Sequence, residues 1–535
     1  MRNAGLPRLL RVFFLASALA ATAAAADPKG RVVETAEGPV RGVRTGAVDT
    51  FLGIPYAAAP VGDLRWRPPQ PHPRWKGVRD AGAFASHCPQ GPSPFGLASA
   101  TEDCLFLNVF TPAHGDGARD DEEGDDDEDG RLPVMVWIHG GALLVGESDD
   151  YDPARLVKQG VVVVTVNYRL GVLGFLAHPA LTAESPDHAS GNYGLMDQQA
   201  ALRWVQRNIA RFGGDPRRVT LFGESAGGLS VHSQLASPLA AGLFHRAIVE
   251  SGAYALNQPS LAQAEALGTA VSGLAGCTDQ SAACLRAAPV ATLLAALAAT
   301  RTATVIPDVD GKVLTQTVAA AFTSGQFNRM PVIEGSNHDE WRLFVALNIE
   351  LVTGPLLPAQ YTGAIAATLG VPLATAAALG SFYPLVAFPS PGLALSALGT
   401  DAIFACNSRK AARLMSPLVP TYAYEFNDEN APQLFLPPVS FPYGAAHASE
   451  IQYLFDLRSV VPAPPLTADQ QRLSAAMVAY WTNFARTGNP NWLGTPLWPR
   501  YDRTSDTIQS LAPPTSAVET RFATDHKCAI WAPSP

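Results

Sequence analysis

The chain has 535 residues, 47 % of them hydrophobic, and a formal net charge of −9. This length exceeds the usual single core, but a large α/β sheet absorbs it with insertions between strands. One run, residues 120–129, holds nine of the 47 acids, so the rest of the chain, with 38 acids and 38 basic residues, is neutral. The charge therefore gives no basis for a nucleic-acid partner or for binding to an anionic membrane.

Residues 1–26 have the pattern of a cleaved signal peptide. Arginines at positions 2, 8 and 11 precede an apolar run that begins at Val12, and alanines that fit a cleavage site precede Asp27. The run is too short to span a bilayer comfortably, and no cysteine for a lipid anchor occurs before Cys88. We therefore expect an exported protein, periplasmic or extracellular, with no membrane anchor and with a single domain over residues 27–535.

Short β-branched runs, separated by helical patterns, recur along the chain after an alternating N-terminal stretch typical of a β-hairpin. The runs are residues 134–138, 161–166, 219–222, 247–250, 331–334 and 422–426. The clearest helical pattern covers residues 194–212, where apolar residues share one face and two glycines follow. This alternation predicts the α/β class, with a large, mostly parallel sheet flanked by helices.

Two segments between strands depart from this pattern. Residues 115–131 contain the acidic run, which predicts a solvated, disordered insertion; the run lacks the spaced acids of a formed calcium loop. Residues 351–397 are rich in Ala, Leu and Pro, which predicts helices interrupted by proline. We favour a helical cap over the functional site, with a peripheral helical subdomain as the alternative.

Six cysteines fit an oxidising destination. Proximity in the sequence suggests the pairs Cys88–Cys104 and Cys277–Cys284, which leaves Cys406 for Cys528. A zinc site is the alternative interpretation. It is disfavoured because no C-x-x-C pair occurs and the histidines are scattered, so we expect no metal site.

The stretch VTLFGESAGGLSV, residues 219–231, predicts a strand, a sharp turn and a helix. Gly223 and Gly227 flank Ser225 in a G-x-S-x-G pattern, which lifts a serine hydroxyl off the end of a buried sheet beside a helix N-terminus. A purely structural turn is the alternative. A catalytic serine also requires a base, an acid and donors for an oxyanion.

Two later segments and one earlier segment offer these groups. The sequence HGGA, residues 139–142, follows a predicted strand and lets backbone N–H groups approach an oxyanion. Residues 334–340 offer the carboxylates of Glu334, Asp339 and Glu340. In the chain order serine, acid, histidine, only His447 and His526 remain as bases. His526 lies two residues before Cys528, where a disulfide would restrain it, so His447 is the expected base.

Several long segments resemble the type-B carboxylesterase and cholinesterase family over essentially the whole mature chain. They are residues 102–110, 139–146, 167–176, 191–216, 223–228 and 481–491. The resemblance implies the α/β-hydrolase fold and supports the three cysteine pairs. It also implies a triad and an oxyanion hole. The triad residues are Ser225, Glu340 and His447, and the oxyanion donors are the N–H groups of Gly141, Ala142 and Ala226.

Three departures from the family pattern stand out. Trp341 occupies a position where the family usually has glycine, which leaves open a different path of the acid loop, with Asp339 as the alternative acid. Ala142 replaces a glycine but keeps its N–H. The loop between Cys88 and Cys104 lacks the tryptophan that binds choline in cholinesterases, and Phe95 is its only aromatic residue.

The resemblance and these residues together predict a serine hydrolase that cleaves carboxylic esters through an acyl-enzyme, with no metal or organic cofactor. The expected substrate is a small neutral ester with a short to medium acyl chain. A lipase or amidase of the same fold is the closer alternative. A non-catalytic binding module is the other alternative, and relatives of that kind generally lack a triad residue that this chain retains.

Overall fold

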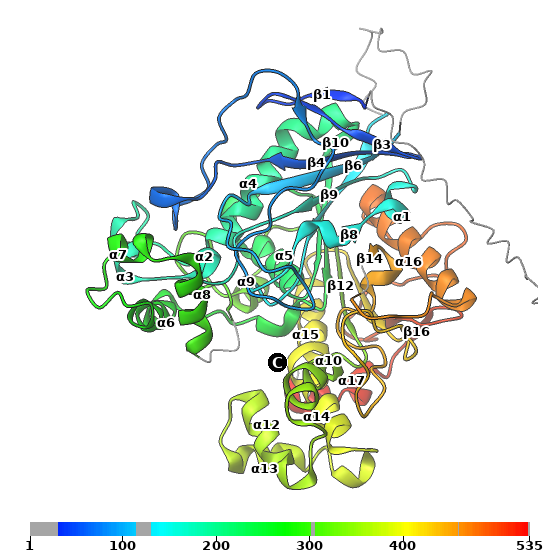
Figure 1. The fold of residues 1–535 in the computed structure, drawn as a ribbon. Helices are drawn as coiled ribbons and strands as arrows, with labels where there is room; N and C mark the ends of the chain where they lie inside the picture. The colour runs from blue at the N-terminus through cyan, green and yellow to red at the C-terminus, as the bar shows by residue number, and fades with distance from the viewer. Residues whose placement is uncertain (1–29, 114–129, 301–304, 458–459, 533–535) are drawn as a thin grey trace, which may run out of the picture.

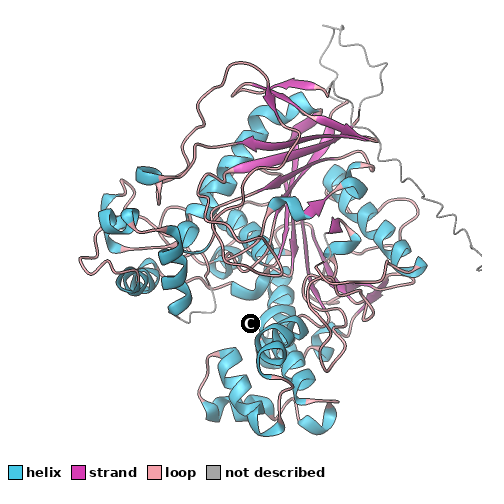
Figure 2. Cartoon of the chain, in the orientation of Figure 1, coloured by secondary structure: helices cyan, strands magenta, loops and turns pink. Residues whose placement is uncertain are grey.

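The computed structural model describes residues 30–113, 130–300, 305–457 and 460–532. The predicted signal peptide and residues 115–129 of the acidic insertion lie outside these ranges. A central sheet of eleven strands forms the middle of the molecule, with helices against both faces (Figure 1, Figure 2). The predicted α/β class with a mostly parallel sheet is therefore confirmed.

The sheet is parallel in its centre and antiparallel at its edges. Its strand order is β16-β15-β13-β12-β11-β10-β7-β9-β6-β4-β3. The parallel strands are β9 (Val162–Val166), β7 (Leu132–Ile138), β10 (Gly214–Glu224), β11 (Arg246–Glu250), β12 (Val332–Asn337), β13 (Thr421–Phe426) and β15 (Ile508–Leu511). The antiparallel strands are β3 (Val43–Thr45), β4 (Val48–Pro55), β6 (Phe106–Pro112) and β16 (Ala517–Glu519). All six predicted runs coincide with strands, although Val161 and Pro331 lie one residue before theirs. The other five strands of this sheet, β3, β4, β6, β15 and β16, were not among the predicted runs.

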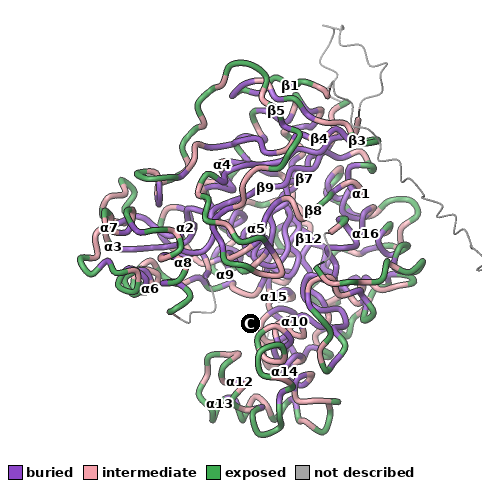
Figure 3. The backbone as a smooth tube through the Cα atoms, in the orientation of Figure 1, coloured by how far each residue is buried: buried purple, intermediate pink, exposed green. Residues whose placement is uncertain are grey.

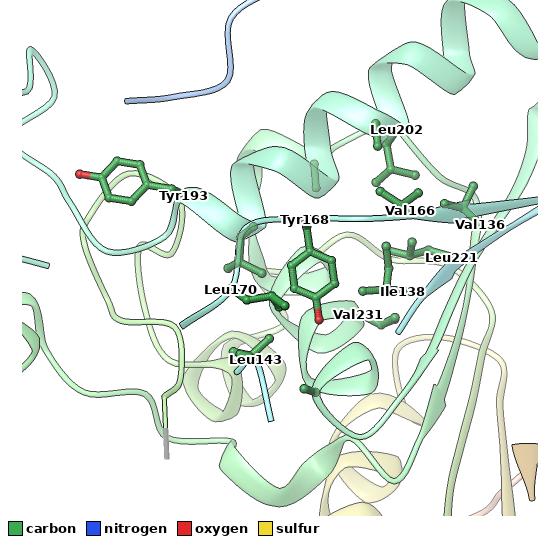
Figure 4. Close-up of a cluster of buried hydrophobic side chains, with 14 of the residues drawn as sticks. Val136, Ile138, Leu143, Val166, Tyr168, Leu170, Tyr193, Leu202, Leu221 and Val231 are labelled. Carbon is green, nitrogen blue, oxygen red and sulfur yellow. The ribbon is translucent and has the colours of Figure 1, made fainter. Parts of the chain in front are cut away.

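Side chains of the central strands alternate between two apolar cores. On one face, Val136 and Ile138 of β7 pack in a cluster with Leu202 of α4 (Tyr193–Asn208) and residues of α5 (Ala226–Ala236) (Figure 4). These residues are fully buried, and the central strands are accordingly coloured as buried in Figure 3. Burial of each such side chain contributes about 1.5–3 kcal/mol, so the sheet centre is the rigid part of the molecule.

The opposite face of the sheet is covered by α16 (Ala468–Thr487). Trp137 of β7 points to this side and shares a core cluster with Trp481 of α16. The helix begins with a capping box, in which Thr467 Oγ1 accepts from the Gln470 N–H and Gln470 Oε1 accepts from the Thr467 N–H. The cap fixes the start of the helix, and the tryptophans fix its buried face.

The helix predicted over residues 194–212 is α4, followed by a 3₁₀ turn at Ile209–Phe212. Gly213, the first of the two glycines, ends it with a φ of 87°. This left-handed conformation is one that glycine adopts without a steric penalty.

The segment predicted to be helical with proline interruptions is helical. Its main helices are α12 (Tyr361–Leu369), α13 (Leu373–Gly380) and α14 (Pro391–Gly399). Together with α10 (Trp341–Val345) they enclose a separate apolar core below the sheet in Figure 1. Among the described residues no single helix is both long and apolar enough to cross a bilayer. The pair Trp341–Thr353 and Pro358–Leu369, bent by 116°, passes that test only together.

Three disulfides join Cys88 to Cys104, Cys277 to Cys284 and Cys406 to Cys528. These are the pairs expected from the sequence. Disulfides of this number are typical of proteins in an oxidising compartment, which supports a location outside the cytoplasm. The last pair joins the start of α15 (Cys406–Met415) to α18 (Cys528–Trp531) and so holds the C-terminal tail against the rest of the chain.

Candidate active site

Ser225 lies in a tight turn between β10 and α5. Its φ of 56° and ψ of −118° place a non-glycine residue in a sparsely populated region of backbone space. The two flanking glycines make this turn possible, because a Cβ at Gly223 or Gly227 would lie 2.6 or 1.9 Å from the carbonyl oxygen of Ile138. The turn therefore presses against the end of β7 and holds the serine at the carboxyl edge of the sheet.

The loop after β7 lies beside this turn. A Cβ at Gly140 would lie 3.2 Å from Ser225 Cβ, so the two backbones meet closely. Gly141, Ala142 and Leu143 follow with φ values of 93°, 58° and 59°. Three consecutive left-handed residues, two of them with side chains, are a local strain of the kind that gathers at functional sites.

The expected oxyanion donors come from these two segments. Ala226 is the first residue of α5, and the N–H groups of a first helical turn have no acceptor within the helix. On the other side, Tyr168 Oη donates to the carbonyl of His139 at 2.8 Å and its ring stacks on that imidazole. This contact holds the loop that carries Gly141 and Ala142 in place.

His447 and Glu340 form a close buried pair. His447 Nδ1 lies 2.5 Å from Glu340 Oε2, while Glu340 Oε1 accepts from the Asn337 N–H at 2.8 Å. His447 Nε2 lies 3.2 Å from Oε1 of Glu224, the residue before Ser225, in an orientation that does not form a hydrogen bond. The imidazole therefore bridges the acid loop and the serine turn, and its Nε2 has no hydrogen-bond partner among the described residues.

The three alternative site residues lie elsewhere. Asp339 accepts from the Ala445 N–H at 3.0 Å and pairs with Arg342 at 2.8 Å. Although burial opposes it, hydrogen bonding to His338 and the charge of Arg342 lower the pKa of Asp339. Glu334 lies 2.8 Å from His232 Nε2 inside the core. His526 is held between Asp401 and Glu425, each at 2.6 Å, in the C-terminal tail.

Buried carboxyl groups set the electrostatics around His447. Burial alone would lower the pKa of this histidine, but Glu224 and Glu340 raise it to about 9. Burial raises the pKa of Glu224, raises that of Glu250 to about 8 with a contribution from Glu450, and raises that of Glu450 to about 7. Glu250 is therefore largely protonated near neutral pH, and the site holds fewer fixed charges than its acids suggest.

Aromatic side chains cover His447 from the helical side. Its ring centroid lies 5.1 Å from Phe344 and 4.9 Å from Phe404. Trp341 packs against Phe344 with ring centroids 4.5 Å apart, and the backbone N–H of Trp341 donates to Thr400 Oγ1 at 3.0 Å. Phe344 and Phe404 flank the predicted cap segment, residues 351–397, on either side, and a cap formed by that segment itself stays a prediction.

Trp341 does not divert the acid loop. A Cβ at Gly399 would lie only 2.2 Å from the indole of Trp341. The indole therefore fits because position 399 is a glycine. Glu340, the preceding residue, still reaches His447.

Glu250, Glu450, Phe344 and Phe404 were not predicted from the sequence as parts of the site. Glu224 stood within the serine motif but was given no role. No local pattern distinguishes Phe404, because it lies in a π-helical turn, Thr400–Ala405, that only the packing against His447 explains.

Comparison with known proteins places the chain among esterases. The model of the family described as "Carboxylesterase family" matches residues 29–362 and 389–531 of this chain. The chain is 37 % identical to the pyrethroid hydrolase Ces2e of Rattus norvegicus over 490 residues, which cover 86 % of this chain and 82 % of that protein. It is 37 % identical to the fumonisin B1 esterase of Sphingopyxis macrogoltabida, with 91 % and 87 % covered. It is 35 % identical to the cocaine esterase of Homo sapiens, with 88 % and 84 % covered.

The close contact at the serine turn generates a stability prediction. Gly227→Ala should lower the melting temperature by several degrees, because its Cβ meets a backbone carbonyl that cannot yield and overpacking costs about 1–3 kcal/mol. Gly363→Ala is the matched control: Gly363 is exposed in α12 with open space around it, and alanine is the better helix former. Differential scanning calorimetry would contradict the packing argument if both variants melted alike.

Proposed function

The chain belongs to the carboxylesterase family and is a carboxylic ester hydrolase, and we propose that Ser225, His447 and Glu340 form its catalytic triad. One observation carries the proposal: the buried imidazole of His447 lies 2.5 Å from the Glu340 carboxylate through Nδ1, while Nε2 faces the turn that carries Ser225. This is the arrangement that a serine nucleophile requires of its base and acid.

In the first half of the reaction, Ser225 Oγ attacks the ester carbonyl and His447 Nε2 takes the hydroxyl proton. The resulting imidazolium is stabilised by Glu340, which also fixes the tautomer through Nδ1–H. The N–H groups of Gly141, Ala142 and Ala226 would receive the negative charge that develops on the carbonyl oxygen. Each such donor is worth about 2.7–4 kcal/mol in acyl transfer.

In the second half, His447 returns its proton to the leaving alcohol, which departs and leaves an acyl group on Ser225. His447 then removes a proton from water, and the hydroxide attacks the acyl carbon. Collapse of this second tetrahedral intermediate releases the carboxylic acid and restores the serine hydroxyl. All proton transfers pass through one imidazole nitrogen, so no further acid or base is required.

We propose a neutral ester as the substrate class and a location in the periplasm or outside the cell, reached through the signal peptide over residues 1–26. The aromatic and apolar surroundings of His447 favour an acyl or aryl group. Protonation of nearby carboxyls removes negative charge that would attract a cation. The names of the relatives refer to chemically diverse esters, among them pyrethroids, fumonisin B1 and cocaine.

Substitution of the triad residues tests the proposal. Ser225→Ala should reduce kcat for p-nitrophenyl butyrate by at least about 10⁴-fold without a change in melting temperature, because it removes the nucleophile and keeps the turn glycines. Glu340→Gln should also reduce kcat steeply, whereas Asp339→Asn, the matched neighbour, should have a milder effect. Retention of more than one per cent of turnover in Ser225→Ala, or a larger loss in Asp339→Asn than in Glu340→Gln, would reject these roles.

The raised pKa of His447 generates a pH prediction. The base must be neutral to accept the serine proton, so kcat/KM should rise with pH until about 9. Glu224→Gln removes a carboxyl that raises the pKa of His447, so the midpoint of this acid limb should shift to lower pH. Glu429→Gln, at an exposed position, is the control and should leave the midpoint in place. An unmoved midpoint in Glu224→Gln would show that another group titrates.

Substrate charge is the third test. The value of kcat/KM for p-nitrophenyl butyrate should exceed that for butyrylthiocholine by at least about tenfold at matched pH and salt. A tenfold ratio corresponds to about 1.4 kcal/mol, which is about the energy of one cation–aromatic contact, and the proposed neutral-ester site does not make that contact. An equal or higher value for the thiocholine ester would contradict the neutral-ester proposal. It would instead assign a cation-binding face to an aromatic side chain near His447, such as Phe344 or Phe404.

A further inference from the structure

A second group of histidines and carboxylates lies at the carboxyl ends of β12 and β13, apart from the triad. His338 directly follows β12, and its N–H donates to the Phe426 carbonyl at 3.0 Å. Glu425 belongs to β13, and His526 follows α17 (Phe522–Asp525) in the C-terminal tail. One potential ligand atom from each of these three residues lies within 4.8 Å of the other two. Three segments distant in the sequence therefore converge on one point.

Each imidazole has a carboxylate on its Nδ1. His526 Nδ1 lies 2.6 Å from Asp401 Oδ1, and His338 Nδ1 lies 3.2 Å from Asp339 Oδ1. Such contacts fix the ring orientation and leave Nε2 as the nitrogen that can bind an ion. His526 Nε2 lies 2.6 Å from Glu425 Oε1, and an ion bound between these two atoms would replace that contact. A carboxylate behind a histidine is the usual surrounding of metal-bound imidazole. Here both candidate histidines have it.

The group carries an excess of acids. The carboxyl of Glu519 pairs with that of Glu425, and its Oε1 is buried without a hydrogen-bond partner among the described residues. Arg342, which contacts Asp339 at 2.8 Å, contributes one permanent positive charge. Asp339, Asp401, Glu425 and Glu519 thus place four carboxyl groups, all potential oxygen ligands, around two imidazoles.

We propose that His338, Glu425 and His526 bind a divalent transition-metal ion, of which Zn²⁺ fits the ligand set best. Imidazole nitrogen with a carboxylate oxygen is a ligand set that Zn²⁺ accepts, whereas Ca²⁺ and Mg²⁺ require mainly oxygen. Tetrahedral bonds of about 2.0–2.1 Å separate neighbouring ligand atoms by about 3.3 Å, so the present positions need only small shifts. Glu519 or a water completes the coordination.

The surroundings admit such an ion and give it a structural role. Glu425 and His526 are buried, while the side chain of His338 is 35 % exposed and provides the access route from solvent. His338 lies two residues before Glu340, and His526 lies two residues before Cys528. The ion would therefore fasten the C-terminal tail to the acid loop, next to the disulfide Cys406–Cys528. This inference is independent of the triad assignment, because none of its ligands is a triad residue.

Isothermal titration calorimetry of the full mature chain with Zn²⁺, after dialysis against a chelator, tests the site. The expected result is one Zn²⁺ per chain with a Kd of about 1 μM or tighter and a melting temperature that rises with Zn²⁺. His338→Asn should weaken this binding at least tenfold and abolish the rise in melting temperature. Because His338 is partly exposed, this variant keeps the test valid even where Glu425→Gln does not fold.

Two controls separate this site from other histidines. His72→Asn changes a partly exposed histidine outside this group and should leave Zn²⁺ binding unchanged. His87→Asn alters the group formed by His87, Glu147 and Asp149, which also brings potential ligand atoms together, and should likewise leave the tight binding intact. The absence of saturable Zn²⁺ binding, or binding that is lost in His87→Asn and kept in His338→Asn, would overturn the proposal.

Discussion

The close contact between the serine turn and the end of β7 is the constraint on which the rest of the site depends. Gly223 pairs with Ile138 in the parallel register of β10 and β7, and Gly227 packs on the same carbonyl one turn later. Because neither position has a Cβ, the backbones approach closely enough to hold Ser225 in its strained conformation. The loop after β7 begins at the same point, so the serine and the expected oxyanion donors form one rigid unit.

The other half of the site is assembled by Asn337, the last residue of β12. Its N–H donates to Glu340, while its side-chain amide donates to the Ala446 carbonyl at 2.9 Å and to Glu450 at 2.5 Å. The loop of Glu340 and the loop of His447 are thus both hydrogen-bonded to one asparagine, in addition to the direct contact between Glu340 and His447. Removal of such a buried hub would leave several polar groups unsatisfied, each at a cost of about 1–3 kcal/mol.

The departure from the family pattern at Trp341 illustrates how packing compensates for a local change. The indole needs space that a side chain at Gly399 would fill, and the two residues come from α10 and α14, which are distant in the sequence. The result is an aromatic layer of Trp341, Phe344 and Phe404 against the imidazole of His447. A bulky residue beside the acid therefore extends the apolar lining of the site and leaves Glu340 in position.

The sequence by itself predicted the central strands of the sheet and the strand–turn–helix around Ser225. Its β-branched runs indicated buried strands. The glycines around Ser225 and after residue 138 indicated places where two backbone segments approach too closely for a side chain. What it could not decide was which distant polar residues meet. Glu340 rather than Asp339 faces His447 because Arg342 and Ala445 engage Asp339, and scattered histidines such as His338 and His526 converge because β12, β13 and the C-terminal tail end at one edge. Local patterns record the neighbours of a residue along the chain, whereas charge pairing and convergence depend on the order of the strands in space.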